Sequence, residues 1–155
     1  MFFQDSPSRA RRITKKGDTI ISTVRTYLKT ICYLEKFQDN LIVSTGFAVL
    51  NPNKSIESKY LYYSILSEYF VQSTISLSKG VAYPAINPSD LGGIYVLQPK
   101  IEEQQEIVNY LDKQTSKIDK AIQKIQQKIN LLEEYKKSLI HHVVTGKADV
   151  RGVEI

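Results

Sequence analysis

Histidine and acidic side chains are the first candidates for chemistry in this sequence. His141 and His142 are neighbours, so on a helix their side chains point about 100° apart and cannot chelate one metal ion together. Glu102, Glu103 and Glu106 stand near the start of an expected helix, where carboxylates favour the helix dipole, and no base or nucleophile accompanies them. We therefore expect a protein that is not an enzyme and that holds no metal or cofactor.

The lone cysteine and the glycines add no catalytic motif. Cys32 is the only cysteine, which excludes an internal disulfide and is typical of a reducing compartment; we expect it to be a small buried residue. The pair Gly92-Gly93 is not followed by the residues of a phosphate-binding loop or a dinucleotide fingerprint. Methyl transfer, nucleotide hydrolysis and nuclease chemistry therefore lack their residues.

Length and hydropathy predict one globular module with an appendage. The chain has 155 residues, of which 42% are hydrophobic, enough for an ordinary packed core. No run of about 18 uncharged apolar residues is present, and the amino end leads directly into charged residues. We expect a cytoplasmic protein with neither a membrane span nor a signal peptide.

The positive charge is concentrated near the amino end. The net charge is +5, and residues 1–36 hold eight Lys or Arg against three acids, whereas the remainder holds thirteen of each. Such asymmetry indicates a polyanionic partner, usually nucleic acid, although a solubilising surface has the same composition.

Residues suited to DNA gather at three expected turns or loops. They are Lys15 and Lys16 before the turn "KKGD", Arg25, Tyr27 and Lys29 around a strand end, and Lys79, Gly80 and Tyr83 in the loop "LSKGVAYPAI". Lysine neutralises phosphates without reading sequence, whereas arginine can pair with guanine through two hydrogen bonds. Taken alone, each group is also compatible with plain solvated surface.

Residue periodicity predicts the elements that position these loops. β-Branched and aromatic runs predict strands near 11–14, 18–24, 29–34 and 41–50, and a short strand at 94–99. Three- and four-residue spacing predicts a helix over 58–75 with Ser58 as its cap. The tyrosines of that helix favour packing over base stacking. The fold class is therefore α+β: a small mixed α/β domain followed by a long coiled-coil-type helix.

Residues 101–144 contain neither Gly nor Pro and follow a heptad pattern. With residue 101 at position a, every a and d position is aliphatic except Gln104, Thr115 and Lys136. Gly146 stands where a helix cap is expected. The predicted dimerisation or spacer seam consists of Leu111, Ile118, Ile122, Ile125, Ile129, Leu132, Leu139 and Val143.

Thr115, beside Asp112 and Ser116, predicts a break between a short helix over 102–114 and a straight helix over 117–144. The second helix would be about 40 Å long, more than a domain of this size can cover. We therefore expect a second polypeptide, foremost a second copy of this chain, to complete the coiled coil. The alternative is a helix folded back over its own domain.

Four stretches together resemble the specificity subunit of type I restriction-modification systems. They are "RRITKKGDTIIST", "STGFAVLNPNKSIESKYLYYSILSE", "SKGVAYPAINPSDLGGIYVLQPKIEEQQEIVNYLD" and "KINLLEEYKKSLIHHVVTGKADVR". The resemblance implies a target recognition domain that binds half of a split double-stranded DNA target, with paired antiparallel spacer helices. It also implies modification (methyltransferase) and restriction subunits as partners, which carry the chemistry.

By position, the DNA-facing loops of that family fall on two sets of residues. They are Lys15, Lys16, Arg25, Thr26, Tyr27 and Lys29, and Ser78, Lys79, Gly80, Tyr83 and Asn87.

The chain also departs from the resemblance, because a complete subunit has two recognition domains and two spacer helices. We expect a recognition domain over 1–100, incomplete at its amino end, helices over 101–146 and a tail over 147–155. An artificially shortened chain, a fragment gene and an exchangeable half-subunit are all compatible with this. A further alternative is a half-subunit that binds no DNA and serves only as an adaptor for assembly and dimerisation.

Overall fold

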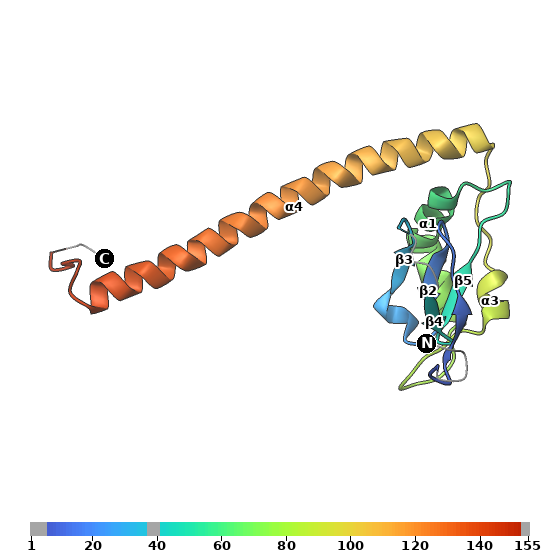
Figure 1. Cartoon of the computed structure of the whole chain (residues 1–155), viewed down its shortest axis with the longest axis horizontal. Helices are drawn as coiled ribbons and strands as arrows, with labels where there is room; N and C mark the ends of the chain where they lie inside the picture. The colour runs from blue at the N-terminus through green and yellow to red at the C-terminus, as the bar shows by residue number, and fades with distance from the viewer. Residues whose placement is uncertain (1–5, 37–40, 153–155) are drawn as a thin grey trace. The chain divides into compact units, whose positions relative to one another are not determined.

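The computed structural model describes residues 6–36 and 41–152. The chain divides into two compact units, Met1–Asn109 and Tyr110–Ile155. Every described strand and the shorter helices belong to the first unit, and most of the long helix and the tail belong to the second (Figure 1). The α+β class is confirmed. The first unit includes the start of the long helix, because the first turns of that helix pack on it.

Two antiparallel sheets form the frame of the first unit. β1 (Ala10–Ile13) pairs with β4 (Ile42–Ser44), and β2 (Thr19–Ser22) lies between β3 (Ile31–Tyr33) and β5 (Phe47–Leu50). The strands predicted near 11–14, 18–24 and 29–34 are thereby confirmed, each shorter than or offset by a few residues from the prediction.

The turn between β1 and β2 forms where "KKGD" predicts it. The Asp18 N–H donates to the Lys15 carbonyl (3.2 Å), and the Asp18 carboxylate accepts from the Lys15 N–H (2.7 Å). Gly17 has a φ of +87°, a conformation that glycine adopts without steric cost. The turn fixes the start of β2 and leaves both lysine side chains exposed.

Two strand predictions are wrong. The strand expected over 41–50 is two strands in different sheets, because the chain turns at Thr45-Gly46, where the Gly46 carbonyl accepts from both the N–H and the hydroxyl of Thr23 (2.9 and 3.0 Å). Residues 94–99, expected to form a strand, belong to no sheet of the described chain. Ile94 and Val96, two residues apart, instead pack against the core.

The helix predicted over 58–75 is interrupted and has a different cap. It forms α1 (Ser58–Leu66) and α2 (Glu68–Leu77), separated by Ser67, whose extended backbone ends α1 and whose hydroxyl accepts from the Phe70 N–H (3.3 Å). The cap of α1 is Glu57 rather than Ser58, because the Glu57 carboxylate reaches the Tyr60 N–H (2.6 Å). The short helix α3 (Pro88–Gly92) follows and was not predicted.

The core lies between the three-stranded sheet and these helices. Its buried residues are Ile21, Ala48, Ile65, Phe70, Ile86 and Leu91. The expectation that Cys32 is buried is wrong, because side chains alternate along the edge strand β3 and Ile31 takes the packed face, so Cys32 is exposed.

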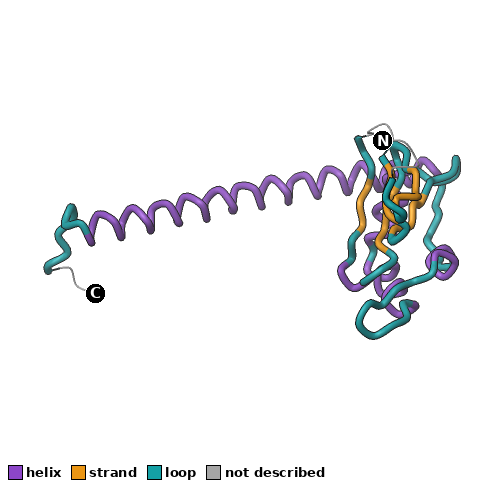
Figure 2. The backbone as a smooth tube through the Cα atoms, turned by 60° about the horizontal axis from the view of Figure 1, so that its bottom comes forward, coloured by secondary structure: helices purple, strands orange, loops and turns teal. Residues whose placement is uncertain are grey.

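α4 (Ile101–Val144) is one helix of 44 residues, about 66 Å at the usual rise, and Figure 2 shows its backbone without interruption. The break predicted at Thr115 is therefore wrong. The Thr115 hydroxyl donates to the Leu111 carbonyl (2.8 Å), so this side chain is satisfied inside the helix. Gly146 ends the helix as predicted, with φ +72°, and the N–H groups of Gly146 and Lys147 donate to Val143 and His142.

The first turns of α4 are anchored to the loop before α1 by a buried amide. The Gln104 side chain is fully buried, its oxygen accepts from the Glu57 N–H (2.8 Å), and its nitrogen donates to the carbonyls of Ser55 (3.2 Å) and Pro99 (2.8 Å). The amide nitrogen and oxygen of Gln104 thus both have partners within the first unit. This explains why a glutamine stands at a heptad position where an aliphatic residue is expected.

Candidate nucleic-acid interface

The arginine loop, residues 24–30, follows β2 and has an unusual backbone. It contains the 3₁₀ turn η2 (Thr26–Leu28), and the residues on either side, Arg25 and Lys29, both have φ +52°. Residues other than glycine rarely adopt positive φ, and such residues concentrate at functional sites. The loop therefore holds an arginine and a lysine in fixed backbone positions.

The glycine loop, residues 78–87, connects α2 to α3 at the lower edge of the module in Figure 1. Lys79 and Ala85 close its base with two backbone hydrogen bonds of 2.8 and 2.9 Å. Gly80 has φ +109°, and a side-chain carbon there would lie 3.3 Å from the Tyr83 carbonyl. Glycine adopts this conformation without strain, and any other residue there would also have to displace the Tyr83 carbonyl by a few tenths of an ångström.

Backbone and side-chain contacts join the two loops into one surface. The Arg25 N–H donates to the Pro84 carbonyl (2.7 Å) and the Ile86 N–H donates to the Thr23 carbonyl (2.9 Å), which makes an antiparallel bridge between Val24 and Ala85. The guanidinium carbon of Arg25 lies over the Tyr83 ring, 4.5 Å from its centroid, which is a cation–π contact. Segments far apart in the sequence therefore present Arg25 and Tyr83 together.

Thr26 and Ser78 lie at the junction rather than at its outer face. Their hydroxyl oxygens are 2.7 Å apart, and because the Ser78 hydroxyl donates to the Thr74 carbonyl (2.7 Å), Thr26 is the donor between them. Thr26 is buried and Ser78 is half-buried. These two residues hold the loops together, whereas Arg25, Tyr27, Lys79 and Tyr83 are exposed around them.

Lys29 is paired with an acid of α2. Its ammonium lies 3.5 Å from the Glu68 carboxylate, and both side chains are exposed. The hydrogen bond from Gln72 and then the charge of Lys29 lower the pKa of Glu68 below its usual value. The Glu68 carboxylate therefore offsets part of the positive charge of the arginine loop.

The remaining predicted DNA-facing residues lie apart from the Arg25–Tyr83 contact. Lys15 and Lys16 precede Thr19, at the end of β2 opposite to the arginine loop. Asn87 is exposed at the end of the glycine loop, where its amide donates to the Asp90 carboxylate (3.4 Å). The sequence-predicted residues thus form one joined surface, a separate lysine pair, and Asn87 at the end of the glycine loop.

Two exposed residues of the same region are not predicted from the sequence. The Arg9 guanidinium lies close to Gly46, 3.8 Å from where a side-chain carbon at Gly46 would be. The Gly46 carbonyl accepts hydrogen bonds from Thr23, the residue just before the arginine loop, so Arg9 lies near that loop. Val81 is fully exposed in the glycine loop. No sequence motif marks Arg9, because strand pairing between β1 and β4 brings it there.

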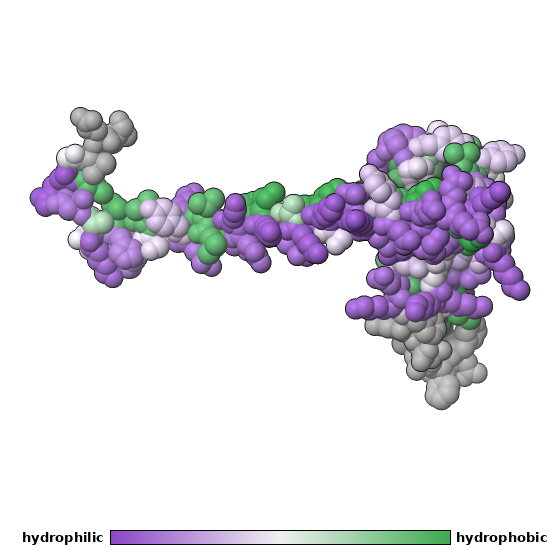
Figure 3. All heavy atoms as spheres, turned by 90° about the horizontal axis from the view of Figure 1, so that it is seen from above, coloured by the Kyte–Doolittle hydropathy of each residue, from purple (hydrophilic) through white to green (hydrophobic). Residues whose placement is uncertain are grey.

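The predicted seam of α4 forms a row of exposed aliphatic side chains. Ile118, Ile122, Ile125, Ile129, Leu132 and Leu139 are 44–66% exposed, whereas Leu111 and Val143 are partly buried. Figure 3 shows hydrophobic side chains recurring along the helix between hydrophilic ones. Within the second unit no described element covers this row, so it is available to another helix.

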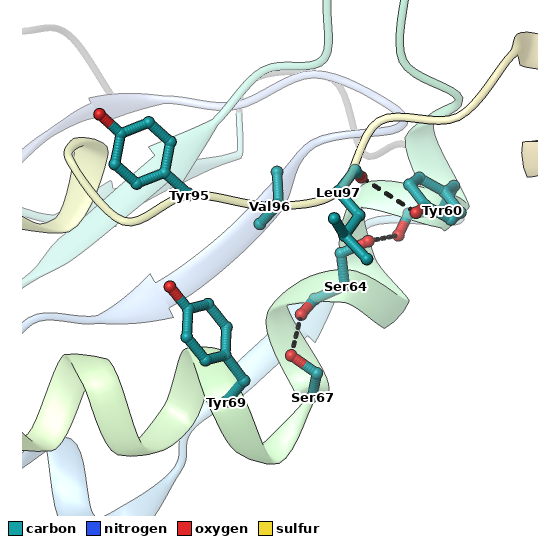
Figure 4. Close-up of a pocket in the computed structure, with 7 residues that line it drawn as sticks. All are labelled: Tyr60, Ser64, Ser67, Tyr69, Tyr95, Val96 and Leu97. Carbon is teal, nitrogen blue, oxygen red and sulfur yellow. Dashed lines mark hydrogen bonds between the residues drawn. The ribbon is translucent and has the colours of Figure 1, made fainter.

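An apolar groove of about 530 Å³ lies in the first unit, lined by Tyr60, Ser64, Ser67, Tyr69, Tyr95, Val96 and Leu97 (Figure 4). The Tyr60 hydroxyl donates to the Leu97 carbonyl (3.0 Å), and the hydroxyls of Ser64 and Ser67 donate to backbone carbonyls of α1. The lining contains no Asp, Glu, His, Lys or Arg side chain. The groove can therefore accept an apolar side chain.

Neither a metal-binding cluster nor a membrane-spanning helix occurs in the described ranges. Across residues 6–36 and 41–152, no three His, Cys, Asp or Glu side chains lie close enough together to bind a metal ion. Within the same part of the chain, no helix has the length and apolar character needed to cross a bilayer.

Comparison with known proteins identifies relatives with a similar sequence. A family model described as the type I restriction modification DNA specificity domain matches residues 8–133. The specificity subunit of the type I restriction enzyme HindI from Haemophilus influenzae is 29% identical over 121 residues, which are 75% of this chain and 26% of that subunit. The specificity subunit of the MjaVIII enzyme from Methanocaldococcus jannaschii is 28% identical over 101 residues, 65% of this chain and 23% of that subunit.

Solved structures show the same likeness over nearly the whole chain. The crystal structure of the HsdS subunit from Thermoanaerobacter tengcongensis superposes with a TM-score of 0.67 at 26% identity, covering 98% of this chain and 38% of that one. A chain from a study of complex assembly and conformational transition of the type I R-M system gives a TM-score of 0.70 at 25% identity, with the same coverage. This chain thus spans about a quarter of the length of the curated relatives it matches. It belongs to the family of type I restriction-modification DNA specificity domains.

Proposed function

We propose that this chain is the DNA-recognition half of a type I restriction-modification specificity subunit. Its first unit binds one half of a bipartite double-stranded target. Its helix α4 pairs with α4 of a second copy, or with the corresponding helix of another specificity half-subunit, and sets the distance between the half-sites. The chain carries out no catalysis; modification and restriction subunits assemble on it in the cytoplasm and supply the chemistry.

The joining of the arginine and glycine loops is the observation that carries the DNA-binding part. Arg25 and Lys79 are exposed on segments that share backbone hydrogen bonds, so two cations reach a ligand from one rigid surface. Arg9 adds a third cation near the same end of β2. Exposed cations on fixed backbone are suited to the phosphates of duplex DNA. Lys15, Lys16 and Asn87 belong to the proposal as flanking contacts.

The exposed seam of α4 supports the spacer part of the proposal. Six aliphatic side chains that are 44–66% exposed form a heptad row, and two such rows bury each other in a coiled coil. Pairing of two identical chains has twofold symmetry, so it predicts a palindromic target with two half-sites.

Salt dependence of DNA affinity tests the proposed function. Fluorescence anisotropy with a random-sequence duplex at about 50 mM and 200 mM salt should show a loss of about forty-fold if three phosphates are contacted. A double change Arg9→Ala and Lys79→Ala should flatten this dependence, whereas Lys54→Ala and Lys100→Ala, outside the joined surface, should leave it unchanged. Absence of salt-dependent binding would contradict DNA recognition by this chain.

The alternative is an adaptor that holds modification subunits and binds no DNA. The continuous helix α4 favours this alternative, because the helix could pair with a partner whether or not the first unit binds DNA. Co-purification with modification subunits together with no DNA affinity at low salt would support this alternative.

A further inference from the structure

The backbone of Arg25 is held by contacts from both loops. Its N–H donates to Pro84 (2.7 Å), and its carbonyl accepts from the Leu28 N–H (2.9 Å). The next side chain, Thr26, is hydrogen-bonded to Ser78 (2.7 Å). The Arg25 Cα is therefore fixed from both loops, and its positive φ is maintained by these contacts.

The guanidinium of Arg25 is oriented but has unused hydrogen-bonding capacity. Its carbon lies 4.5 Å from the centroid of the Tyr83 ring, which restricts the side chain without supplying an oxygen or nitrogen acceptor. Among the residues that the structure describes, none accepts a hydrogen bond from this side chain. A fork of N–H donors is thus pre-oriented at an exposed position, and pre-orientation reduces the entropy lost on binding.

The neighbours of Arg25 suit a base edge better than a phosphate. Val81 is fully exposed and Tyr83 is 62% exposed in the same glycine loop. An apolar tip gains nothing beside a phosphate, whereas in the major groove it can contact the methyl group of thymine. Lys29, in contrast, already shares its charge with Glu68.

We propose that Arg25, stacked on Tyr83, reads a guanine in the major groove of the half-site through two hydrogen bonds to its O6 and N7 atoms. This inference rests on the proposed function. Arg9 and Lys79 contact phosphates and position the module, and Arg25 determines the base at one position of the target.

The test is selection of duplexes from a random pool by the full chain and by the Arg25→Lys variant. This variant keeps the charge but loses the fork, so it should show the salt dependence of the wild type and no preference at one G·C pair. On the wild-type consensus its affinity should be about tenfold lower. Replacing that guanine by 7-deazaguanine, which lacks N7, should weaken the wild type and leave Arg25→Lys unaffected.

A pair of Tyr83 variants separates stacking from folding. Tyr83→Phe keeps the ring and should select the wild-type consensus, whereas Tyr83→Ala should lose much of the preference at the same base pair. Thermal unfolding of each variant establishes that the module remains folded.

The outcomes distinguish this inference from the proposed function. If the wild type selects no sequence, the proposed function fails and the inference fails with it. If the wild type selects a consensus that Arg25→Lys also selects, or one of A·T pairs alone, only the guanine contact is overturned. A consensus whose single G·C pair depends on Arg25 supports both.

Discussion

The ion pair between Lys29 and Glu68 predicts that one acidic side chain weakens DNA binding. Glu68→Gln keeps the size and the hydrogen-bonding reach toward Gln72 but removes a negative charge from the joined surface. Affinity for duplex DNA at low salt should rise by about two- to fivefold, because Lys29 then faces phosphates without competition. The measurement is an anisotropy titration, with Glu106→Gln, exposed on α4, as the control. Unchanged or weaker binding by Glu68→Gln would place DNA away from Lys29.

The pH dependence of this pair follows from the same charges. The pKa of Glu68 is lowered, first by the Gln72 hydrogen bond and then by Lys29, so the carboxylate remains ionised to a lower pH than in the unfolded chain. A lowered carboxyl pKa contributes stability above the unfolded value, and this contribution is lost as the pH falls through the folded value. Once protonated, Glu68 carries no charge, so the difference in DNA affinity between the wild type and Glu68→Gln should disappear in acid, at a pH below the usual carboxyl pKa.

Residue types could be predicted from the sequence more readily than their roles. Arg25, Lys79 and Tyr83 were predicted from composition and from the family resemblance, and the structure brings Arg25 and Tyr83 into contact. Thr26 and Ser78 carried the same expectation but lie at the junction of the loops. Only the pairing of distant segments decides which side of a loop faces outward, and no local pattern encodes that pairing.

At the scale of elements, we expect that removing the Gln104 amide substantially lowers the free energy of unfolding. Gln104→Ala removes the side-chain partner of the Glu57 N–H and of the Pro99 carbonyl, whereas the Ser55 carbonyl still accepts from Gln98 (3.0 Å); the loss should lower the free energy of unfolding by about 2–4 kcal/mol. Urea unfolding followed by circular dichroism measures this. Gln105→Ala, exposed one residue along α4, should change the free energy by less than about 0.5 kcal/mol. Equal effects of the two changes would contradict the anchor.

The seam of α4 makes a second prediction at this scale. Leu132→Lys places a charge in the middle of the aliphatic row and should weaken self-association by at least about tenfold. Gln127→Lys adds the same charge at an exposed position outside the seam and should leave association unchanged. Sedimentation equilibrium of the two variants and the wild type measures this. A wild-type monomer at high concentration, or an unaltered dimer of Leu132→Lys, would argue against pairing through the seam.

Element types were predictable, but their continuity was not. Heptad periodicity and the absence of Gly and Pro predicted α4, yet the break expected at Thr115 does not occur, because its hydroxyl bonds inside the helix. Conversely, the helix over 58–75 is interrupted at Ser67, whose hydroxyl caps the following helix. Serine and threonine can act in either way, and tertiary packing decides between them.

At the scale of the whole molecule, the proposed base-reading module is joined to a spacer that pairs two such modules. The first unit alone would recognise one short DNA motif. Helix α4 alone would only bring two chains together. Together they predict two copies of one motif in inverted orientation, separated by a constant gap.

Selection of binding sites from a random duplex pool tests this central claim most directly. The full chain should enrich sequences with two short inverted half-sites at one fixed spacing, and Leu132→Lys should enrich single half-sites with lower affinity. Enrichment of one uninterrupted motif, or of half-sites at variable spacing by the wild type, would contradict the account.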